Sequence, residues 1–155
     1  MNNNISLTKS DFLLFLEAPR HLWAAKHDLI EKIPSPFETN VMKQGYGVEA
    51  LAKEYLNKFV LETDENLIFQ KTFIDNQFTV RMDILINKSS TDSYELYEFK
   101  SGTRVKKDNI YNVTYQFLII NKQIKIDRVL ILHLNSEYAW YLFLNLADQF
   151  GQFLE

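Results

Sequence analysis

The 155-residue sequence contains no cysteine, only 4 glycines and 3 prolines, and no hydrophobic run long enough to cross a membrane. Without cysteine, a disulfide scaffold, a cysteine-ligated zinc or iron–sulfur site and a cysteine nucleophile are all excluded. The scarcity of glycine and proline excludes a collagen-like or low-complexity chain. The N-terminus lacks the basic start and apolar run of a secretory signal peptide. We therefore expect a soluble, cytoplasmic protein without a membrane partner.

Length and composition are those of one globular domain. Hydrophobic residues make up 46% of the chain and charged residues 24%, close to the average for soluble proteins. A chain of this length can bury roughly 70% of the surface that it exposes when unfolded, which is enough for a hydrophobic core. The sequence contains no internal repeat or linker, so residues 1–155 are predicted to form one domain. The sequence leaves open whether that domain is the N-terminal part of a longer protein.

Helices are predicted from capping signals and from apolar periodicity. Thr8 and Asp11 have the spacing of a capping box, and they precede the apolar residues of a short helix. Apolar residues also recur at helical spacing between residues 37 and 59. Further helices are expected from Asp108 or Asn109 to about residue 121, and over part of the apolar tail 140–155.

Strands are predicted where apolar residues alternate with polar ones or run without interruption. The expected strands cover residues 67–74, 78–87, 94–100 and 124–134. In the second strand, Asp83 lies on the polar side, opposite a face made of Phe78, Val80, Met82, Ile84 and Ile86. The resulting order, α-α-β-β-β-α-β, predicts an α/β fold in which helices flank a mixed central sheet.

Charge is distributed unevenly along the chain. The net charge is only −3, which is not that of an obvious nucleic-acid binder. Between residues 100 and 128, however, seven basic residues stand against two acidic ones, so this basic block carries +5. The seven are Lys100, Arg104, Lys106, Lys107, Lys122, Lys125 and Arg128. The block indicates either a site for an anionic ligand or an ordinary solvated surface.

Glu98 and Lys100 are the residues with the clearest chemical implication. Residues two apart in a strand project to the same face, so this acid and this base lie side by side in an otherwise apolar strand. If the preceding strand pairs with it, Asp83 faces Glu98. Two adjacent carboxylates repel each other unless a cation lies between them, and Mg²⁺ or Mn²⁺ prefers such oxygen ligands. The alternative is a structural salt bridge between Lys100 and one acid.

The pattern Asp83…Glu98-Phe99-Lys100 resembles the signature of the PD-(D/E)xK nuclease superfamily, and its neighbours resemble the RecB-like branch. Upstream, Gly45-Tyr46-Gly47-Val48-Glu49 is similar to the Gly-x-x-x-His motif of that branch, with Glu in place of His. Downstream, Gln116 matches the glutamine of the helix that follows the motif lysine, and Tyr115 is adjacent to it. The segment around Ala18-Pro19 resembles the start of such domains, but it lacks their cysteine, so no iron–sulfur cluster is expected.

The resemblance implies a restriction-endonuclease-like core and a divalent-metal-dependent deoxyribonuclease acting in DNA repair, recombination or defence. It implies Mg²⁺ or Mn²⁺ on Glu49, Asp83, Glu98 and the carbonyl of Phe99, with Lys100 completing the catalytic set. The residues expected to hold DNA, with single strands or ends preferred, are Arg104, Lys106, Lys107, Tyr115 and Gln116. A helicase or a C-terminal domain is an expected partner.

Two interpretations of different classes remain open at this stage. The first is the metal-dependent nuclease. The second is a catalytically inactive module on the same fold that binds nucleic acid. Individual residues also have ordinary alternatives: Glu49 can pair with Lys53 one helical turn away, and Gln116 can be a surface residue of its helix. His27 and His133 are interpreted as residues without a ligand role.

Overall fold

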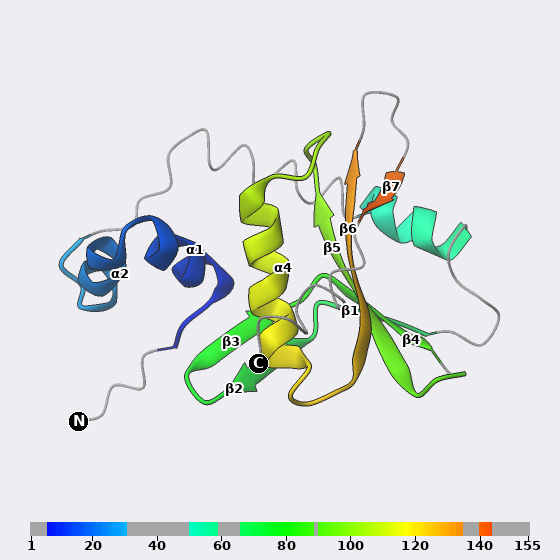
Figure 1. Ribbon diagram of the computed structural model, residues 1–155, viewed down its shortest axis with the longest axis horizontal. Coiled ribbons are helices and arrows are strands. Elements are labelled where there is room, and N and C mark those ends of the chain that lie inside the picture. The colour runs from blue at the N-terminus through cyan, green and yellow to red at the C-terminus, as the bar shows by residue number, and fades with distance from the viewer. Residues whose placement is uncertain (1–5, 31–49, 59–65, 89, 135–139, 144–155) are drawn as a thin grey trace.

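The computed structural model describes residues 6–30, 50–58, 66–88, 90–134 and 140–143, which fold into two sheets and four helices (Figure 1). Three of these helices are α1 (Lys9–Glu17), α2 (Pro19–Lys26) and α4 (Lys107–Ile120). The fourth covers residues 50–58 and is drawn in cyan in Figure 1. Among the residues described, no helix combines the length and the hydrophobicity that a membrane crossing requires.

The main sheet has five strands in the order β1-β4-β5-β6-β7. These strands are β1 (Asn66–Phe69), β4 (Ile84–Lys88), β5 (Ser93–Lys100), β6 (Ile126–Leu134) and β7 (Trp140–Phe143). Strands β5 and β6 are parallel, whereas the other neighbours are antiparallel. Because parallel neighbours need a crossover, α4 carries the chain from the end of β5 back to the start of β6. The predicted α/β fold with a mixed sheet is therefore confirmed.

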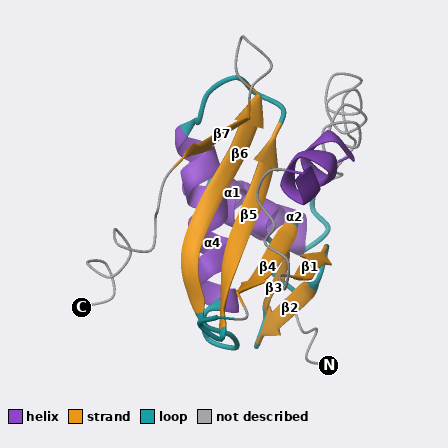
Figure 2. Cartoon of the chain, turned by 90° about the vertical axis from the view of Figure 1, so that its right-hand side faces the viewer, coloured by secondary structure: helices purple, strands orange, loops and turns teal. Residues whose placement is uncertain are grey.

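Helices cover both faces of the main sheet, and each face has its own hydrophobic core. Helix α4 lies on one face and residues 50–58 lie on the other (Figure 2). On the α4 side, the core includes Leu85, Leu96, Val129, Ile131, Val113 and Ile120. On the other side it includes Ile84, Ile86, Tyr97, Leu130, Ala52 and Leu56. The alternation of neighbouring residues between the two cores reflects the period of two along a strand.

The first two predicted strands, 67–74 and 78–87, are each divided in the structure. Their outer halves form a separate hairpin of β2 (Thr72–Asp75) and β3 (Phe78–Arg81). The break falls at Gln70, whose φ is 48°, and opposite it at Met82 and Asp83. This interruption changes the phase of the alternation. Met82 packs on the α4 side, whereas Ile84 packs on the opposite side, so the prediction of one shared face was wrong.

Element boundaries also differ from the predictions. Helix α4 begins at Lys107, earlier than predicted, because the backbone N–H of Lys106 donates to the side chain of Asn109 at 2.9 Å. Strand β6 begins at Ile126, after the predicted start at 124. Residues 140–143 form strand β7, which was not predicted. Helix was expected over part of the tail 140–155, and the rest of that tail lies outside the described residues. Of the predicted helix over 37–59, the described part, 50–58, is helical.

Candidate functional site

The centre of the candidate site is Glu98 on β5, a carboxylate with 0% exposed surface. Four side-chain nitrogens surround its oxygens. They are the ammonium groups of Lys100 at 2.5 Å and Lys9 at 3.1 Å, and the amide groups of Gln116 at 2.7 Å and Asn112 at 3.4 Å. A carboxylate buried in a protein is costly unless it is paired and hydrogen-bonded. Here two cations and two amide donors meet that requirement.

Strand geometry places Lys100 beside Glu98. The side chains of residues 96, 98 and 100 project toward α4, because Leu96 belongs to the core on that side. Lys100 pairs in register with His133 of β6, and His133 is buried. The Lys100 side chain is 23% exposed, so the Glu98–Lys100 ion pair reaches from the interior to the surface. The predicted proximity of this acid and this base is present in the structure.

Asp83 lies immediately before β4 and next to Glu98. Ile84 pairs with Tyr97 across the two antiparallel strands, so one further step along each strand brings Asp83 opposite Glu98. An Oδ atom of Asp83 accepts a hydrogen bond from the backbone N–H of Phe99 at 2.8 Å. This bond fixes the carboxylate beside the end of β5. We call Asp83 and Glu98 the acidic pair.

The two members of the acidic pair have opposite pKa shifts. Burial and the negative charge of Glu98 raise the pKa of Asp83 to about 7. Burial alone would also raise the pKa of Glu98, but the ammonium groups of Lys9 and Lys100 lower it to about 2. The negative charge therefore resides on Glu98, whereas Asp83 exchanges a proton near neutral pH. Such a divergence is typical of functional sites.

Lys9, a contact of Glu98 that sequence reasoning missed, is the first residue of α1. The start of this helix is held by the predicted capping box. The N–H of Thr8 donates to the Asp11 carboxylate at 2.9 Å, and the N–H of Asp11 donates to the Thr8 hydroxyl at 3.3 Å. Lys9 is 89 positions from Glu98 in the sequence, so no local spacing could have linked the two residues.

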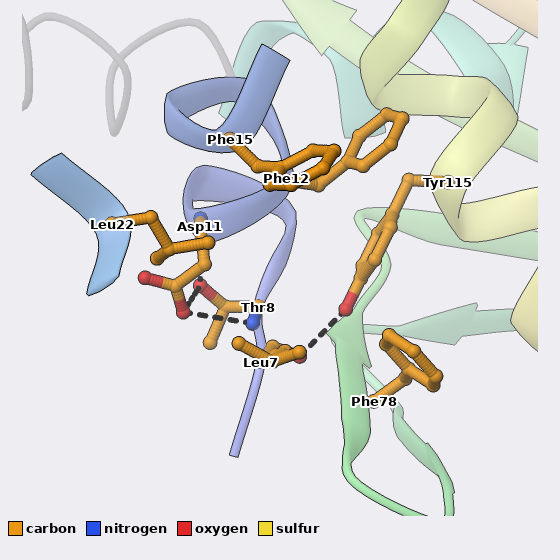
Figure 3. A pocket seen from close by; sticks show the side chains of 8 residues that line it. All are labelled: Leu7, Thr8, Asp11, Phe12, Phe15, Leu22, Phe78 and Tyr115. Atoms are coloured by element: carbon orange, nitrogen blue, oxygen red, sulfur yellow. Dashed lines mark hydrogen bonds between the residues drawn. The ribbon is translucent and has the colours of Figure 1, made fainter. Parts of the chain in front are cut away.

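Tyr115 of α4 fixes the segment that precedes α1 (Figure 3). Its hydroxyl donates to the carbonyl of Leu7 at 2.6 Å, and its ring stacks on Phe12 with centroids 5.3 Å apart. These residues line an apolar pocket of about 280 Å³ between α1, α2 and β3. Burial, followed by the negative charge of Asp11, raises the pKa of Tyr115 to about 12. Tyr115 thus joins α1 to α4, the two helices that supply groups to Glu98.

Asn112 and Gln116, which we call the amide pair, lie one turn apart on the buried side of α4. Both donate through their NH₂ groups to Glu98. Their carbonyl oxygens are the buried side-chain atoms without a hydrogen-bond partner in the described part of the chain. Leaving a buried acceptor unpaired costs about 1–3 kcal/mol, so two at one site need an explanation. Asn112 was not identified from the sequence.

The residues predicted to bind DNA fall into two groups. Arg104, Lys106 and Lys107 are exposed in the segment that follows β5 and opens α4. Tyr115 and Gln116 are buried and use their polar groups inside the protein, so in this structure neither lies on a surface that a strand could contact. Their place in the sequence within the basic block did not reveal that both side chains face the interior of the protein.

The predicted metal ligands are only partly within the described structure. Asp83 and Glu98 are together, whereas Glu49 lies outside the described residues. Phe99 contributes its backbone N–H to Asp83; its carbonyl was the predicted ligand. No group of three or more His, Asp or Glu side chains that could hold an ion occurs among the described residues. The oxygen donors present are the two carboxylates and the two unpaired amide carbonyls. Hard oxygens of this kind suit Mg²⁺ or Mn²⁺.

Comparisons with known proteins indicate the fold but not the activity. No family model matches the chain. Among curated proteins, the chain is 30% identical over 86 residues to the uncharacterized protein UU173 of Ureaplasma parvum serovar 3. That match covers 56% of this chain and 12% of the relative, so the chain spans a small part of its length. Among solved structures, the crystal structure of SSO0001 has a TM-score of 0.52 and 10% identity, and the match covers 96% of this chain and 72% of that one. At this identity the likeness extends to the α/β fold alone.

Proposed function

We propose that this domain is a divalent-metal-dependent nuclease that hydrolyses phosphodiester bonds in DNA. The observation that carries the proposal is the meeting of the acidic pair with Lys100 at the end of β5, beneath α4. Two carboxylates and an amine, on strands that adjoin in the sheet, are the groups that such hydrolysis requires. The proposal agrees with the resemblance of Asp83…Glu98-Phe99-Lys100 to the PD-(D/E)xK signature. That resemblance implies a restriction-endonuclease-like core.

The residues at the site fit Mg²⁺ or Mn²⁺ by the chemistry of their donors. The acidic pair supplies two carboxylates, one of which has its pKa raised to about 7 by burial and by the charge of the other. A cation between them would relieve that repulsion. The unpaired carbonyl oxygens of the amide pair are hard oxygen atoms of the kind that would bind such an ion or its water. Glu49 and the carbonyl of Phe99 remain proposed ligands.

Each group of the chain has a defined part in the proposed reaction. A bound divalent ion supplies Lewis acidity to a phosphate oxygen and lowers the pKa of a water molecule. The acidic pair would hold the ion, and the amide pair fixes the orientation of Glu98. Lys100 orients the attacking water and offsets the negative charge that develops on the phosphate. The water oxygen bonds to phosphorus, the bond to the leaving oxygen breaks, and that oxygen takes up a proton.

The proposed substrate is DNA, with single strands or free ends preferred. Arg104, Lys106 and Lys107 are exposed next to the end of β5 that carries Lys100, so positive charge adjoins the site. Lysine and arginine contacts to phosphates carry no sequence information, which favours sequence-tolerant cutting. A helicase or a further domain of a longer chain is the partner class that would supply strands or ends.

The proposal is tested with end-labelled DNA oligonucleotides, single-stranded and duplex, incubated with Mg²⁺, Mn²⁺ or chelator. The parent should cut with metal, and Lys100→Met should lose at least about a hundredfold in rate because the charge on the phosphate is no longer offset. Lys71→Met, which replaces an exposed lysine immediately before β2, is the matched control and should cut like the parent. Equal cutting by Lys100→Met and the control would refute the mechanism.

A second function is favoured by the charge balance around Glu98. Two ammonium groups already pair with Glu98, so the chain itself compensates the charge of this buried carboxylate. On that basis the alternative is a catalytically inactive module that binds nucleic acid through its exposed basic residues. Anisotropy with labelled DNA in Ca²⁺ separates the two: binding without cutting under any divalent metal supports the inactive module.

A further inference from the structure

We propose that Lys9 is a tethered cation that takes the place of a divalent ion on the acidic pair and leaves it when the ion binds. The proposal rests on the proposed function, because it concerns the same two carboxylates. It assigns a role to a residue of α1 that the Asp…Glu-x-Lys pattern does not contain. The geometry around Glu98, the anchoring of α1 and the charge balance each support it.

The ammonium group of Lys9 bridges the Glu98 carboxylate. Its Nζ atom lies 3.1 Å from one Oε atom and 3.3 Å from the other, so both oxygens share one positive charge. Burial lowers the pKa of Lys9, but the negative charges of Glu98 and then of Asp83 hold that pKa above its usual value. An ammonium group on Glu98, beside Asp83, occupies a position expected of a metal ion shared between the two carboxylates.

Helix α1 does not depend on Lys9 for its attachment. The Lys26 ammonium binds the Asp11 carboxylate at 2.7 Å, within the same helix pair. The N–H of Leu7 donates to the carbonyl of Gln77, and the carbonyl of Leu7 accepts from the N–H of Thr79, both at 2.7 Å. The Lys9 side chain can therefore swing away from Glu98 while the backbone of α1 stays in place. Its side chain is 27% exposed, so a path to solvent exists.

Charge repulsion requires one lysine to leave when the ion binds, and the contact distances indicate which one. Lys9 and Lys100 both pair with Glu98, so a divalent ion that binds this carboxylate would meet two positive charges already in place. Lys100 makes the shorter contact, 2.5 Å, and is carried by β5, the strand that also holds Glu98. Lys9 reaches Glu98 from another layer, at 3.1 Å and 3.3 Å. Both lysines are point charges on flexible stems. Because Lys9 makes the longer contacts and comes from another element, we expect Lys9 to leave when the ion binds.

The test compares Mn²⁺ binding by the parent, Lys9→Met and Lys26→Met, with calorimetric titration and with melting in Mn²⁺ or chelator. Methionine keeps most of the aliphatic stem and removes the charge. Lys26→Met is a matched control, because Lys26 is 23% exposed and pairs with the buried acid Asp11 away from the acidic pair. Lys9→Met should bind Mn²⁺ about tenfold more tightly than the parent because a like charge no longer competes. Its melting temperature should rise more with Mn²⁺ than that of the parent.

One further variant and the opposing outcomes complete the test. Lys9→Arg keeps the charge and should bind Mn²⁺ with parent-like affinity, which separates charge from side-chain length. Lys26→Met should melt lower than the parent but show no gain in Mn²⁺ affinity. Equal or weaker Mn²⁺ binding by a folded Lys9→Met would overturn the proposal, even if the parent cuts DNA. Conversely, a parent that neither binds Mn²⁺ nor cuts, beside a Lys9→Met that binds Mn²⁺, would support the tethered cation and refute the nuclease.

Discussion

Replacing Asp83 with asparagine is expected to change how the stability of the metal-free protein depends on pH. The pKa of Asp83 is raised from 3.8 to about 7, first by burial and then by the charge of Glu98. Between those values the folded protein retains a proton that the unfolded chain has released. The free energy of unfolding therefore falls as pH rises through this window, and the loss is complete above about pH 7. Asparagine cannot lose that proton, so the variant escapes this loss.

The size of the effect follows from the width of the window. One pKa unit corresponds to about 1.4 kcal/mol, and two units of the window lie between pH 5 and pH 7, which gives nearly 3 kcal/mol. Asp83 and Glu98 titrate as a coupled pair, so we expect a smaller change, of about 2 kcal/mol. Glu98 itself adds no slope in this range, because its pKa is lowered to about 2 and its contribution is lost only in acid, below about pH 4.5.

The assay is urea denaturation at pH 5, 6, 7 and 8 with chelator present throughout. Between pH 5 and pH 8, the free energy of unfolding of the parent should fall by about 2 kcal/mol more than that of Asp83→Asn. The asparagine oxygen can still accept the hydrogen bond from Phe99, so the variant should fold. Asp75→Asn, which removes a carboxylate paired with the exposed Lys122, is the control and should follow the parent. Parallel curves for the parent and Asp83→Asn would refute the proposed charge distribution in the acidic pair.

Three further changes have expected outcomes. Glu98→Gln leaves two ammonium groups without their carboxylate, so the free energy of unfolding measured with urea at pH 7 should fall by about 3–5 kcal/mol. An unchanged free energy of unfolding would contradict the buried ion pairs. Tyr115→Phe removes the hydrogen bond to Leu7 and should cost about 1 kcal/mol in the same assay, while DNA affinity measured by anisotropy stays unchanged. The double variant Lys106→Ala and Lys107→Ala should weaken DNA binding alike for all sequences and flatten its salt dependence, whereas an unchanged salt slope would exclude these lysines from the contact.

Much of the fold could be predicted because its signals are local. The capping box of Thr8 and Asp11 depends on a spacing of three residues, and it forms as expected. The period of two along β5 places Glu98 and Lys100 on one side of the strand. The pairing of Ile84 with Tyr97 follows from the short loop that joins the two strands, and it brings Asp83 to Glu98. Each of these relations is fixed by residues close together in the sequence.

The remaining features depend on contacts between distant parts of the chain. Gln70, where the strand breaks, has a positive φ although it is not a glycine, so the sequence gives no signal of the break. The prediction therefore missed that the alternation of faces shifts after Met82. Tyr115 and Gln116 lie within the basic block in sequence, but both are on the side of α4 that is buried in the core. Lys9 reaches Glu98 across two layers. No spacing within one element contains information about such a contact.

Lys9 also offers a physical account of how an acidic site of this kind can fold before an ion reaches it. Two buried carboxylates would oppose folding by mutual repulsion if nothing compensated them. Lys100 alone can neutralise Glu98. Without Lys9, however, Lys100 would be the one lysine whose positive charge counters the rise in the pKa of Asp83. The ammonium group of Lys9 adds the second positive charge from α1, and this helix is held to β3 and α4 through Leu7. Under the proposed function, the contact that stabilises the metal-free fold weakens metal binding, because the Lys9 ammonium group and the divalent ion compete for Glu98. Stability without metal and affinity for metal should therefore change in opposite directions when Lys9 loses its charge.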